Sequence, residues 1–230
     1  MDRQEFIQGL ARRITSLIRP HPVRVAIDGV DAAGKTTLAD ELAAHIERAG
    51  RPVIRASVDG FHNPAVVRRR RGAESPEGYF LDSFNYPALL DALLRPLGHG
   101  GSRRFRRAVF DVRRDQPVDL PLERAEPNAI LLLDGVFLLR PELREHFDFS
   151  VFLRAAFEVT VARAERRDVE LFGSPEAVRR RYQTRYVPGQ RLYLTTVEPE
   201  RWATVVVNND DPLQPVREQP AAGDVIGRRG

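Results

Sequence analysis

The chain has 230 residues, no cysteine, and a formal net charge of +4 that results from 36 basic and 32 acidic residues. The lack of cysteine excludes disulfide bonds and cysteine-ligated metal centres, and it fits a reducing compartment. No apolar run approaches the ~18 residues of a membrane-spanning helix, and the first residues lack the apolar core of a signal peptide. We therefore expect a cytoplasmic protein with no membrane partner, built as one domain with an insertion or a lid.

The first predicted elements form a strand, a loop and a helix. Residues 1–22 have the amphipathic pattern of an N-terminal helix, and the β-branched segment Val23–Asp28 after it predicts a strand. Residues 29–36 read GVDAAGKT and match the pattern G-x-x-x-x-G-K-[ST] of phosphate-binding loops. Apolar residues then recur at helical spacing from Leu38 to Ile46, and a glycine follows as a suitable stop. This order of elements is the context that the motif requires.

Lys35 is the only lysine in the chain, because the other 35 basic residues are arginine. An ammonium group is a compact point charge that fits between phosphate oxygens, whereas a guanidinium is a wide planar fork. Lys35 would reach the β- and γ-phosphates, the Thr36 hydroxyl would face Mg²⁺, and backbone N–H groups would cradle the phosphates. The residues predicted to bind the nucleotide in this segment are Gly29, Asp31, Ala32, Ala33, Gly34, Lys35, Thr36 and Thr37.

Strands and helices alternate along the rest of the chain. Ala129–Asp134 is a nearly continuous apolar run, which is typical of a parallel strand buried on both faces of a sheet. Further strands are expected over Arg51–Asp59, Arg103–Val112, Phe149–Leu153 and Ala203–Val207, and helices over Pro87–Leu97, Phe157–Asp168 and Pro175–Tyr186. The alternation predicts an α/β fold of three layers, in which helices cover both faces of a mostly parallel sheet.

Three carboxylates end predicted strands, namely Asp28, Asp59 and Asp134. In open α/β sheets, ligands bind beyond the carboxyl ends of the strands, so these acids are candidate site residues. Asp134 resembles the Walker-B acid that orients Mg²⁺, with capping of the next segment as the alternative. Asp59 would accept the proton of a hydroxyl that attacks the γ-phosphate, with a role in the following turn as the alternative. Asp28 precedes the loop and is expected to brace it.

Arg163, Arg166 and Arg167 lie three and four residues apart on one predicted helix and therefore share a face. A cationic face that closes over ATP, as part of a lid at about 160–186, would offset charge on a transferred phosphoryl group. We assign Arg163 and Arg167 to catalysis and Arg166 to nucleotide binding. The alternative is a solvated helix whose arginines pair with Glu165, Asp168 and Glu170.

With these parts placed, the chain resembles the uridine kinase and phosphoribulokinase-like group of P-loop kinases over about Val23–Asn209. Residues 57–61 (SVDGF) match a strand-end Asp followed shortly by Phe, and residues 132–135 (LLDG) match an acid followed by Gly. Residues 84–87 (FNYP) stand where uridine kinases have Phe-Asp-His-Pro, and residues 163–168 (RAERRD) resemble their arginine-rich lid. The resemblance implies a P-loop NTPase fold, ATP, Mg²⁺ and transfer of the γ-phosphoryl group to a primary hydroxyl.

The resemblance also implies roles for individual residues. Lys35 and Asp59 would take part in catalysis, with Asp59 as the base, and Thr36 and Asp134 would hold the metal. The residues predicted to contact the acceptor are Asp59, Phe61, His62, Asp82, Asn85, Tyr86, Phe110 and Arg114.

The predicted acceptor residues depart from those of uridine kinases. Asn85 stands where uridine kinases have an Asp that holds the sugar hydroxyls, and Asp82 is its candidate replacement. Arg113 and Arg114 occupy the stretch where a pyrimidine-binding His would be expected. The DGFH run that begins at Asp59, and the RRG run that ends at position 72, also resemble bacterial pantothenate kinase.

We therefore expect an ATP-dependent kinase that phosphorylates a nucleoside such as uridine or cytidine at its 5′-hydroxyl, with a pantothenate- or sugar-type kinase as the alternative. The N-terminal helix (1–22) precedes a kinase domain over 23–212, which carries a β-hairpin insertion at about 100–120, and a loosely ordered tail follows over 213–230. The expected partners are a nucleotide and a small-molecule acceptor, and a homo-oligomer is left open.

Three other classes fit the sequence less well. A GTPase reads guanine with Asn-Lys-x-Asp, which needs a second lysine. An ATPase motor or an assembly-forming P-loop protein usually needs a larger chain and an arginine supplied in trans, and neither explains the strand end at Asp59. The clusters Arg68–Arg71 and Arg103–Arg107 could bind nucleic acid, but few aromatic residues accompany them. Solvated surface or contact with an anionic substrate is the favoured interpretation of these clusters.

Overall fold

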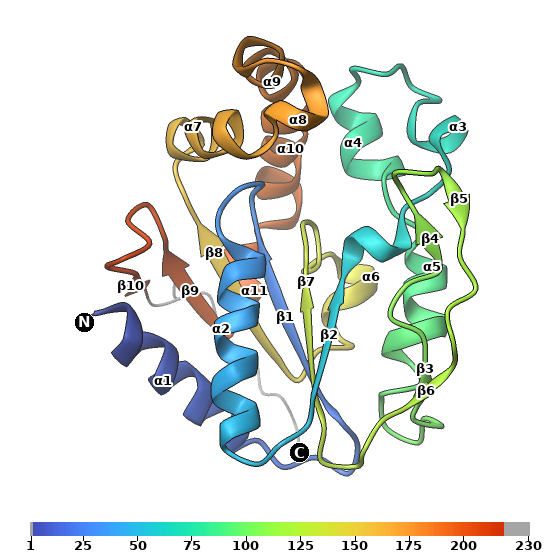
Figure 1. Ribbon diagram of the computed structural model, residues 1–230, viewed down its shortest axis with the longest axis vertical. Helices are drawn as coiled ribbons and strands as arrows, with labels where there is room; N and C mark the ends of the chain where they lie inside the picture. The colour runs from blue at the N-terminus through green and yellow to red at the C-terminus, as the bar shows by residue number, and fades with distance from the viewer. Residues whose placement is uncertain (1, 219–230) are drawn as a thin grey trace.

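The computed structural model describes residues 2–218. Its centre is a six-stranded sheet in the order β10-β9-β8-β1-β7-β2, shown in Figure 1. Only β10 runs antiparallel to its neighbour among these described strands, and the other neighbours pair in parallel. The strands are β1 (Val23–Gly29), β2 (Val53–Ser57), β7 (Ile130–Asp134), β8 (Phe149–Arg154), β9 (Val205–Asn208) and β10 (Val216–Glu218).

Helices cover both faces of this sheet (Figure 1), so the predicted three-layer α/β fold is confirmed. One face is covered by α1 (Arg3–Thr15) and α2 (Lys35–Arg48). The opposite face is covered by α4 (Pro76–Asp82), α5 (Tyr86–Leu89) with its π-helical turn Leu90–Leu94, α6 (Pro141–Arg144), α10 (Val187–Val197) and α11 (Pro199–Trp202). Across residues 2–218, no helix is long and apolar enough to cross a membrane.

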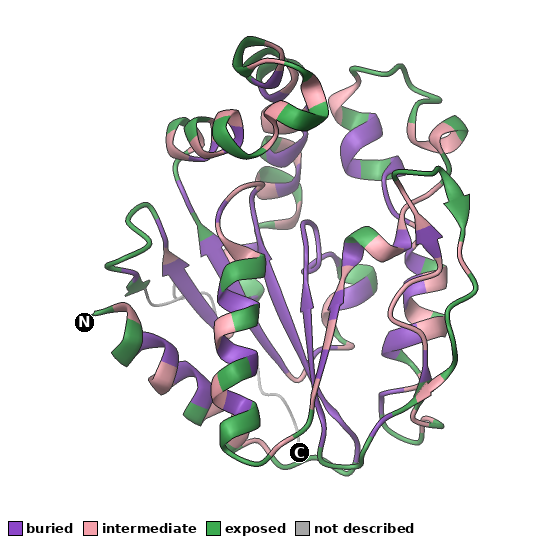
Figure 2. Ribbon diagram, in the orientation of Figure 1, coloured by how far each residue is buried: buried purple, intermediate pink, exposed green. Residues whose placement is uncertain are grey.

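Two apolar cores follow from the alternation of side chains along the buried strands. Leu131 and Leu133 of β7 belong to the core under α4, α5 and α10, whereas Ile130 and Leu132 belong to the core under α1 and α2. Figure 2 shows that the strands are buried almost throughout while the outer faces of the helices are exposed. Burial on both faces explains why the sequence of β7 is apolar without interruption.

Three helices stand above the carboxyl ends of the strands (Figure 1), in the segment predicted to form a lid, and we call them the lid. They are α7 (Phe157–Arg167), α8 (Val169–Phe172) and α9 (Pro175–Arg181). Ala164, Val178 and Tyr182 are buried against one another and give the lid a small apolar core of its own. The lid therefore packs as a unit beside the main cores.

The last helix of the lid continues further than predicted. α9 passes through a π-helical turn (Tyr182–Tyr186) into α10, so the prediction that this helix ends at Tyr186 is wrong. Pro188 has no N–H to donate and would normally interrupt a helix. The π-helical turn before it has a wider hydrogen-bond spacing, and the helix continues past the proline. Gly189 allows α10 to pack closely on α4, because a Cβ at this position would lie 2.8 Å from the Tyr79 ring.

The insertion consists of two short antiparallel strand pairs, one of which lies between the strands of the other in the sequence. β3 (Arg104–Phe105) pairs with β6 (Glu123–Arg124), and β4 (Phe110–Asp111) pairs with β5 (Gln116–Pro117). The insertion thus extends beyond the predicted 100–120, and the predicted strand Arg103–Val112 is interrupted. In the interruption, the Val109 N–H donates to the Gly60 carbonyl at 2.9 Å. The backbone therefore pairs with the 3₁₀ helix η1 (Val58–Phe61) instead of continuing its own ladder.

The C-terminal region differs from the predicted loosely ordered tail. β10 pairs with β9, and Val216 stands opposite Asn208. Without this strand, β9 would present an unpaired edge, and covering such an edge is a common use of a short strand. The rest of the predicted tail, residues 219–230, lies outside the described residues.

Candidate active site

The glycine loop joins β1 to α2, a helix that begins at Lys35 and whose first N–H groups have no carbonyl one turn back. Gly34 has a φ of 98°, in the left-handed region that favours glycine. A Cβ at Gly29 would lie 2.4 Å from the Leu153 carbonyl oxygen, so β8 passes too close for any side chain there. The loop thus has the form of an anion-binding cradle at a helix N-terminus.

Lys35 lies among carboxylates. Its Nζ donates to the Val30 carbonyl at 2.7 Å. Burial lowers the pKa of Lys35, while the charges of Asp31, Asp28, Asp134 and Asp59 act in the opposite direction, in that order of strength. The ammonium group is thus the cation around which the predicted acids gather.

Thr36 and Asp134 meet at the end of β7. The Thr36 hydroxyl donates to Asp134 Oδ2 at 2.8 Å. The other carboxylate oxygen, Oδ1, accepts from Nη2 of Arg55 at 3.1 Å. Arg55 comes from the neighbouring strand β2 and also donates to the Leu132 carbonyl at 3.0 Å. Arg55 was not predicted as a site residue, because a basic residue in a strand is usually exposed to solvent.

The donor set of Thr36 and Asp134 fits a magnesium ion. A hydroxyl and a carboxylate are the hard oxygen ligands that Mg²⁺ takes in phosphate sites, where water and phosphate oxygens complete its shell. Across residues 2–218 no cluster of three or more His, Asp or Glu side chains suits a metal ion. At the glycine loop, Thr36 and Asp134 are the side chains that would hold one.

Asp28 is fully buried behind the loop. Its carboxylate accepts hydrogen bonds from the Gly29 N–H at 2.7 Å, the Leu139 N–H at 3.1 Å and the Tyr193 hydroxyl. Burial raises the pKa of Asp28 to about 6, and these three donors limit the rise. The contacts match the bracing role predicted for Asp28.

Asp31 links the loop to two helices on the other face of the sheet. Its Oδ2 accepts from the Tyr79 hydroxyl at 2.6 Å and from Gln190 Nε2 at 2.8 Å. The Asp31 N–H donates back to Gln190 Oε1 at 3.0 Å. Burial raises the pKa of Asp31, and the charge of Lys35 is the largest opposing effect. The predicted nucleotide-binding Asp31 is thus fixed by α4 and α10.

Arg163 and Asn209 hold the opposite side of the loop. Asn209 Nδ2 donates to the Ala33 carbonyl at 2.7 Å. Arg163 Nη2 donates to the carbonyls of Asn209 at 2.9 Å and Asp210 at 2.8 Å. The guanidinium of Arg163 therefore ties the lid helix α7 to the loop that follows β9.

The three lid arginines have different surroundings in the structure. Arg167 forms a two-point contact with Asp168, and its Nη2 donates to the Tyr182 hydroxyl at 3.2 Å. The Tyr182 hydroxyl in turn donates to Asp168 at 2.9 Å. Arg166 is exposed on α7. Pairing of Arg167 with Asp168 is the alternative that the sequence analysis raised. Arg167 also lies close enough to Asp31 for its positive charge to lower the pKa of that carboxyl group.

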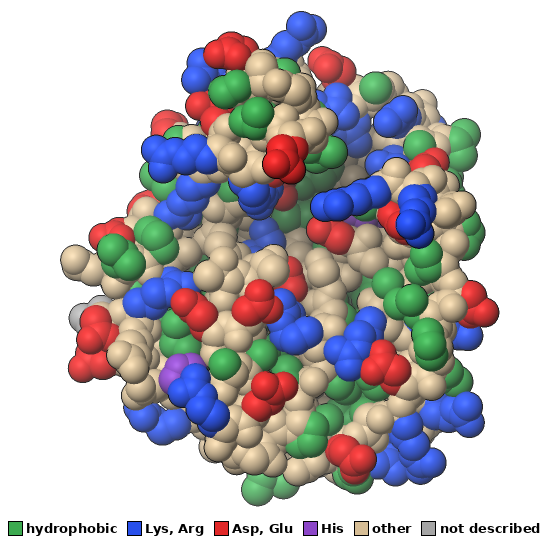
Figure 3. Space-filling view, in the orientation of Figure 1, with side chains coloured by type: hydrophobic (Ala, Val, Ile, Leu, Met, Phe, Trp, Pro, Cys, Tyr) green, Lys and Arg blue, Asp and Glu red, His purple; other side chains and the backbone are tan. Residues whose placement is uncertain are grey.

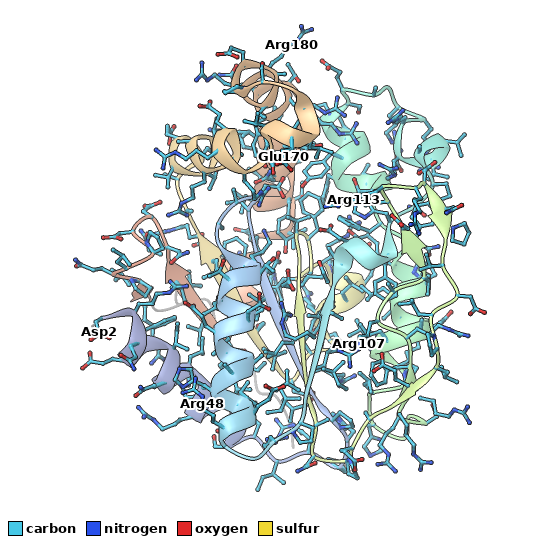
Figure 4. The ribbon with its side chains drawn as sticks, viewed as in Figure 1. Asp2, Arg48, Arg107, Arg113, Glu170 and Arg180 are labelled. Atoms are coloured by element: carbon cyan, nitrogen blue, oxygen red, sulfur yellow. The ribbon has the colours of Figure 1, made fainter. Side chains whose placement is uncertain are left out.

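Asp59 is the accessible acid of the site, with a side chain that is 71% exposed. It lies on η1 at the end of β2, and His62 Nδ1 donates to its carbonyl at 2.9 Å. Figure 3 shows a hollow beneath the lid with basic side chains around its mouth. In Figure 4, Glu170 lies at the lower edge of the lid helices, and Arg113 comes from the turn between β4 and β5.

Several residues predicted to contact the acceptor are buried instead. Phe61 is 0% exposed and Phe110 is 7% exposed, so both belong to the packing of η1 and the hairpin. Tyr86 is 8% exposed, and Arg140 lies over its ring at 4.7 Å. His62 stacks on Phe84 with a centroid separation of 4.5 Å. The structure thus shows Phe61, Tyr86 and Phe110 packed within the fold, and their contact with the acceptor stays a prediction.

Asp82 and Asn85 are also occupied by other partners. The buried carboxylate of Asp82 accepts from Arg70 and, at 2.9 Å, from Arg71. The hydrogen bond from Arg70 is the main cause that lowers the pKa of Asp82. The Asn85 side chain accepts from the Ala88 N–H at 3.0 Å and caps α5. Asp82 thus binds two arginines and the Asn85 side-chain oxygen caps a helix, while their contact with sugar hydroxyls stays a prediction.

Arg114 differs from these buried residues, because its side chain is 74% exposed and lies 3.7 Å from Asp111. Of the predicted acceptor contacts, Asp59, His62 and Arg114 remain at the surface or near it.

The residues that the sequence did not single out lie far from the loop along the chain. Tyr79, Gln190 and Asn209 contact it from α4, α10 and the end of β9, and Tyr193 of α10 contacts Asp28 behind it. Gln190 and Tyr193 are three residues apart on α10 and therefore share a face of the helix. A prediction that extended the helix past Tyr186 would have placed them together.

Comparisons with known proteins agree with this geometry. Residues 25–199 match the phosphoribulokinase/uridine kinase family. A uridine kinase of Brevibacillus brevis is 25% identical over 197 residues, which cover 81% of this chain and 85% of the relative. A protein described as a possible uridine kinase of Bacillus stearothermophilus has a TM-score of 0.69 at 23% identity, with 88% of this chain and 97% of that chain covered.

A second solved structure has a different description. A candidate fructose transport system kinase of a Silicibacter species has a TM-score of 0.68 at 24% identity, with 83% of this chain and 93% of that chain covered. At these identities the two structures establish the fold alone. The family match spans most of the chain, and the chain belongs to the phosphoribulokinase/uridine kinase family of phosphotransferases that act on an alcohol.

Proposed function

We propose that the protein transfers the γ-phosphoryl group of ATP to a primary hydroxyl of a small molecule, with Mg²⁺ as the metal and Asp59 as the base. One observation supports this most strongly. The carboxylates of Asp59 and Asp134 both lie near enough to Lys35 to raise its pKa against the effect of burial, and Asp134 bonds to Thr36, which supports one common site.

The loop and the metal pair would hold the ATP phosphates. The N–H groups at the start of α2 and the Lys35 ammonium bind oxyanions, and the Thr36 hydroxyl and Asp134 would hold Mg²⁺. The metal neutralises phosphate charge when bound. Asn209 and Gln190 keep the loop in shape from opposite sides.

Asp59 is suited to proton transfer by its position. As the hydroxyl oxygen of the acceptor bonds to the γ-phosphorus and the bond to ADP breaks, Asp59 would take the hydroxyl proton. The carboxylate of Asp59 is exposed, and η1 is held on the insertion by the Val109–Gly60 hydrogen bond. Gly60 is required there, because a Cβ would lie 2.6 Å from that of Ala108.

The lid arginines would supply the remaining positive charge. Because Lys35 is the only lysine, any further side chain with a permanent positive charge at the reaction must be an arginine. Arg163 joins α7 to the segment after β9, beside the loop. Arg167 is bound by Asp168 and Tyr182, and it lies near enough to Asp31 to lower the pKa of that residue. We assign charge stabilisation to Arg163 and Arg167 and nucleotide contact to Arg166.

The resemblance to uridine kinases makes uridine and cytidine the first acceptors to test. A pantothenate- or sugar-type acceptor is the second candidate, and one observation favours it. Asn85 caps α5 and Asp82 is bound by two arginines, so the side chains expected to hold ribose hydroxyls are engaged elsewhere.

A coupled ADP-release screen tests the proposal. It compares uridine, cytidine, other nucleosides, pantothenate and simple sugars, with Lys35→Ala as the inactive control. Release of ADP that depends on one acceptor and is lost in the variant supports the kinase. Steady ATP hydrolysis that no acceptor stimulates would favour an ATPase instead.

A further inference from the structure

We propose that a cavity on the outer side of the lid binds a small zwitterion with an apolar body, of the chemical class of an apolar α-amino acid. The cavity has a volume of about 500 Å³, which lies in the range of small-molecule sites. Its walls come from α7, α9, the π-helical turn and α10, and these helices lie together at the top of Figure 1.

The cavity is separate from the candidate active site, because α7 presents a different face to each. Arg163 contacts the glycine loop and the segment after β9, whereas Val161 and Glu165 line the cavity. Residues two apart on a helix point in nearly opposite directions. On α10, Gln190 bonds to the loop while its neighbour Arg191 lines the cavity. An occupant would thus contact both the lid and the helix that holds the loop.

The apolar part of the cavity lies where two cores meet without merging. Phe157 packs against the core under α1 and α2, while Val161 and Val187 pack against the small core of the lid. All three side chains, and that of Pro188 beside them, are only half-buried, so they leave apolar surface in the cavity. Seams between two packing units are common places for ligand sites, because neither unit covers the other completely.

The charged side chains of the cavity are two acids and two arginines. Glu165 and Arg179 satisfy each other through hydrogen bonds of 2.6 Å and 3.1 Å. Glu158 makes no side-chain hydrogen bond or ion pair in the described part of the chain. There, the Arg191 guanidinium likewise has no such partner and lies over the Phe157 ring at 4.7 Å. One charge of each sign therefore lines the cavity unpaired.

This balance of charge selects the ligand class. An anion would leave Glu158 as a repulsive neighbour, and a cation would meet Arg191 in the same way. A zwitterion satisfies both, because a guanidinium binds the two oxygens of a carboxylate and a carboxylate accepts from an ammonium group. An apolar side chain would then cover the exposed parts of Phe157, Val161 and Val187. An apolar α-amino acid combines these three groups in one small molecule.

A competing interpretation gives both charged residues a purely structural role. Glu158 lies in the first turn of α7, where a negative charge favours the helix dipole. The stem of Arg191 would cover the Phe157 ring while its head stays in water. In that case the cavity would not distinguish a zwitterion from molecules that carry only one of its charges.

Isothermal titration calorimetry of the full chain separates the two interpretations. The probes are L-leucine and L-phenylalanine, each compared with the amine that lacks its carboxylate (3-methylbutylamine, phenethylamine) and with the acid that lacks its ammonium group (4-methylpentanoate, 3-phenylpropanoate). We expect at least one amino acid to bind about tenfold or more tightly than both of its analogues, the effect of one charged hydrogen bond. The titration contains no nucleotide and no acceptor, so its outcome is independent of the proposed kinase reaction.

Variants assign each charge to its residue. Arg191→Gln should weaken binding of the amino acid about tenfold and remove its advantage over the amine, while Glu158→Gln should remove its advantage over the acid. Arg180→Gln is the matched control, because Arg180 is exposed on α9 and does not line the cavity. It should leave binding unchanged.

Three results would overturn the proposal. The first is the absence of binding by both amino acids in the millimolar range. The second is equal binding of an amino acid and its singly charged analogues. The third is a preference that survives both Arg191→Gln and Glu158→Gln.

Discussion

The Thr36 hydroxyl and the Asp134 carboxylate are joined by a hydrogen bond of 2.8 Å. This contact connects the first turn of α2 to the end of β7, although the two residues are 98 positions apart in the chain. Arg55 holds the other oxygen of the same carboxylate, so Asp134 has one fixed orientation beside the loop.

Asp134→Asn should weaken the dependence of ATP binding on Mg²⁺. The amide keeps the shape of the side chain but lacks the charge that favours a divalent cation. Titration of ATP with and without Mg²⁺ should show that the metal tightens binding about tenfold less in the variant. Asp40→Asn is the matched control, because Asp40 is the exposed second partner of Arg55. An equal effect of both substitutions would argue against a metal role for Asp134.

Amine-directed labelling of the folded protein should modify Lys35 and the N-terminal amine alone, since no other lysine exists. Burial lowers the pKa of Lys35, which increases the fraction of neutral, reactive amine. Saturating ATP should protect Lys35 and leave the N-terminus reactive, as peptide mass spectrometry can measure. Labelling of Lys35 that is unchanged by ATP would remove the basis for placing phosphates on this loop.

Two glycines should respond to alanine in opposite directions. At Gly29 a Cβ would meet the Leu153 carbonyl at 2.4 Å, so Gly29→Ala should lower the free energy of unfolding by more than about 2 kcal/mol and disrupt ATP binding. Gly9 lies in the middle of α1 with open space around it, and Gly9→Ala should stabilise the fold by about 0.5–1 kcal/mol. Urea unfolding measures both, and a stabilised Gly29→Ala would refute the close approach of β8.

Tyr193→Phe should destabilise the protein by an amount that depends on pH. Asp28 has a folded-state pKa of about 6 against an ordinary value of 3.8, so the folded state binds more protons and the stability due to Asp28 falls as pH rises through this window. The Tyr193 hydroxyl limits this loss because it bonds to the charged carboxylate. The variant should lose about 1–2 kcal/mol at pH 7.5 and clearly less at pH 5. An equal loss at both values would mean that Asp28 does not titrate there.

Elements that depend on local sequence were predictable. The order of β1, loop and α2 follows from an apolar run, a glycine pattern and helical spacing, which neighbouring residues set. The position of Asp134 beside the loop was predictable because the carboxyl ends of parallel strands lie at the same edge of the sheet.

The missed features depend on contacts between distant segments. Asp82 reads as a free acid in sequence, but the fold brings Arg70 and Arg71 onto it. Tyr193 and Gln190 were missed because a helix that passes a proline through a π-helical turn has no simple sequence signal. The acceptor side was therefore harder to predict than the phosphate side, because it is built from pairings across the chain.

The proton acceptor is the central element of the proposed mechanism, and Asp59→Asn tests it most directly. With the best acceptor of the screen, steady-state kinetics should show a fall in kcat of about 10²-fold or more, with KM for ATP unchanged, because the amide cannot take the proton. A variant that keeps kcat and changes only the KM of the acceptor would contradict the mechanism and make Asp59 a binding residue.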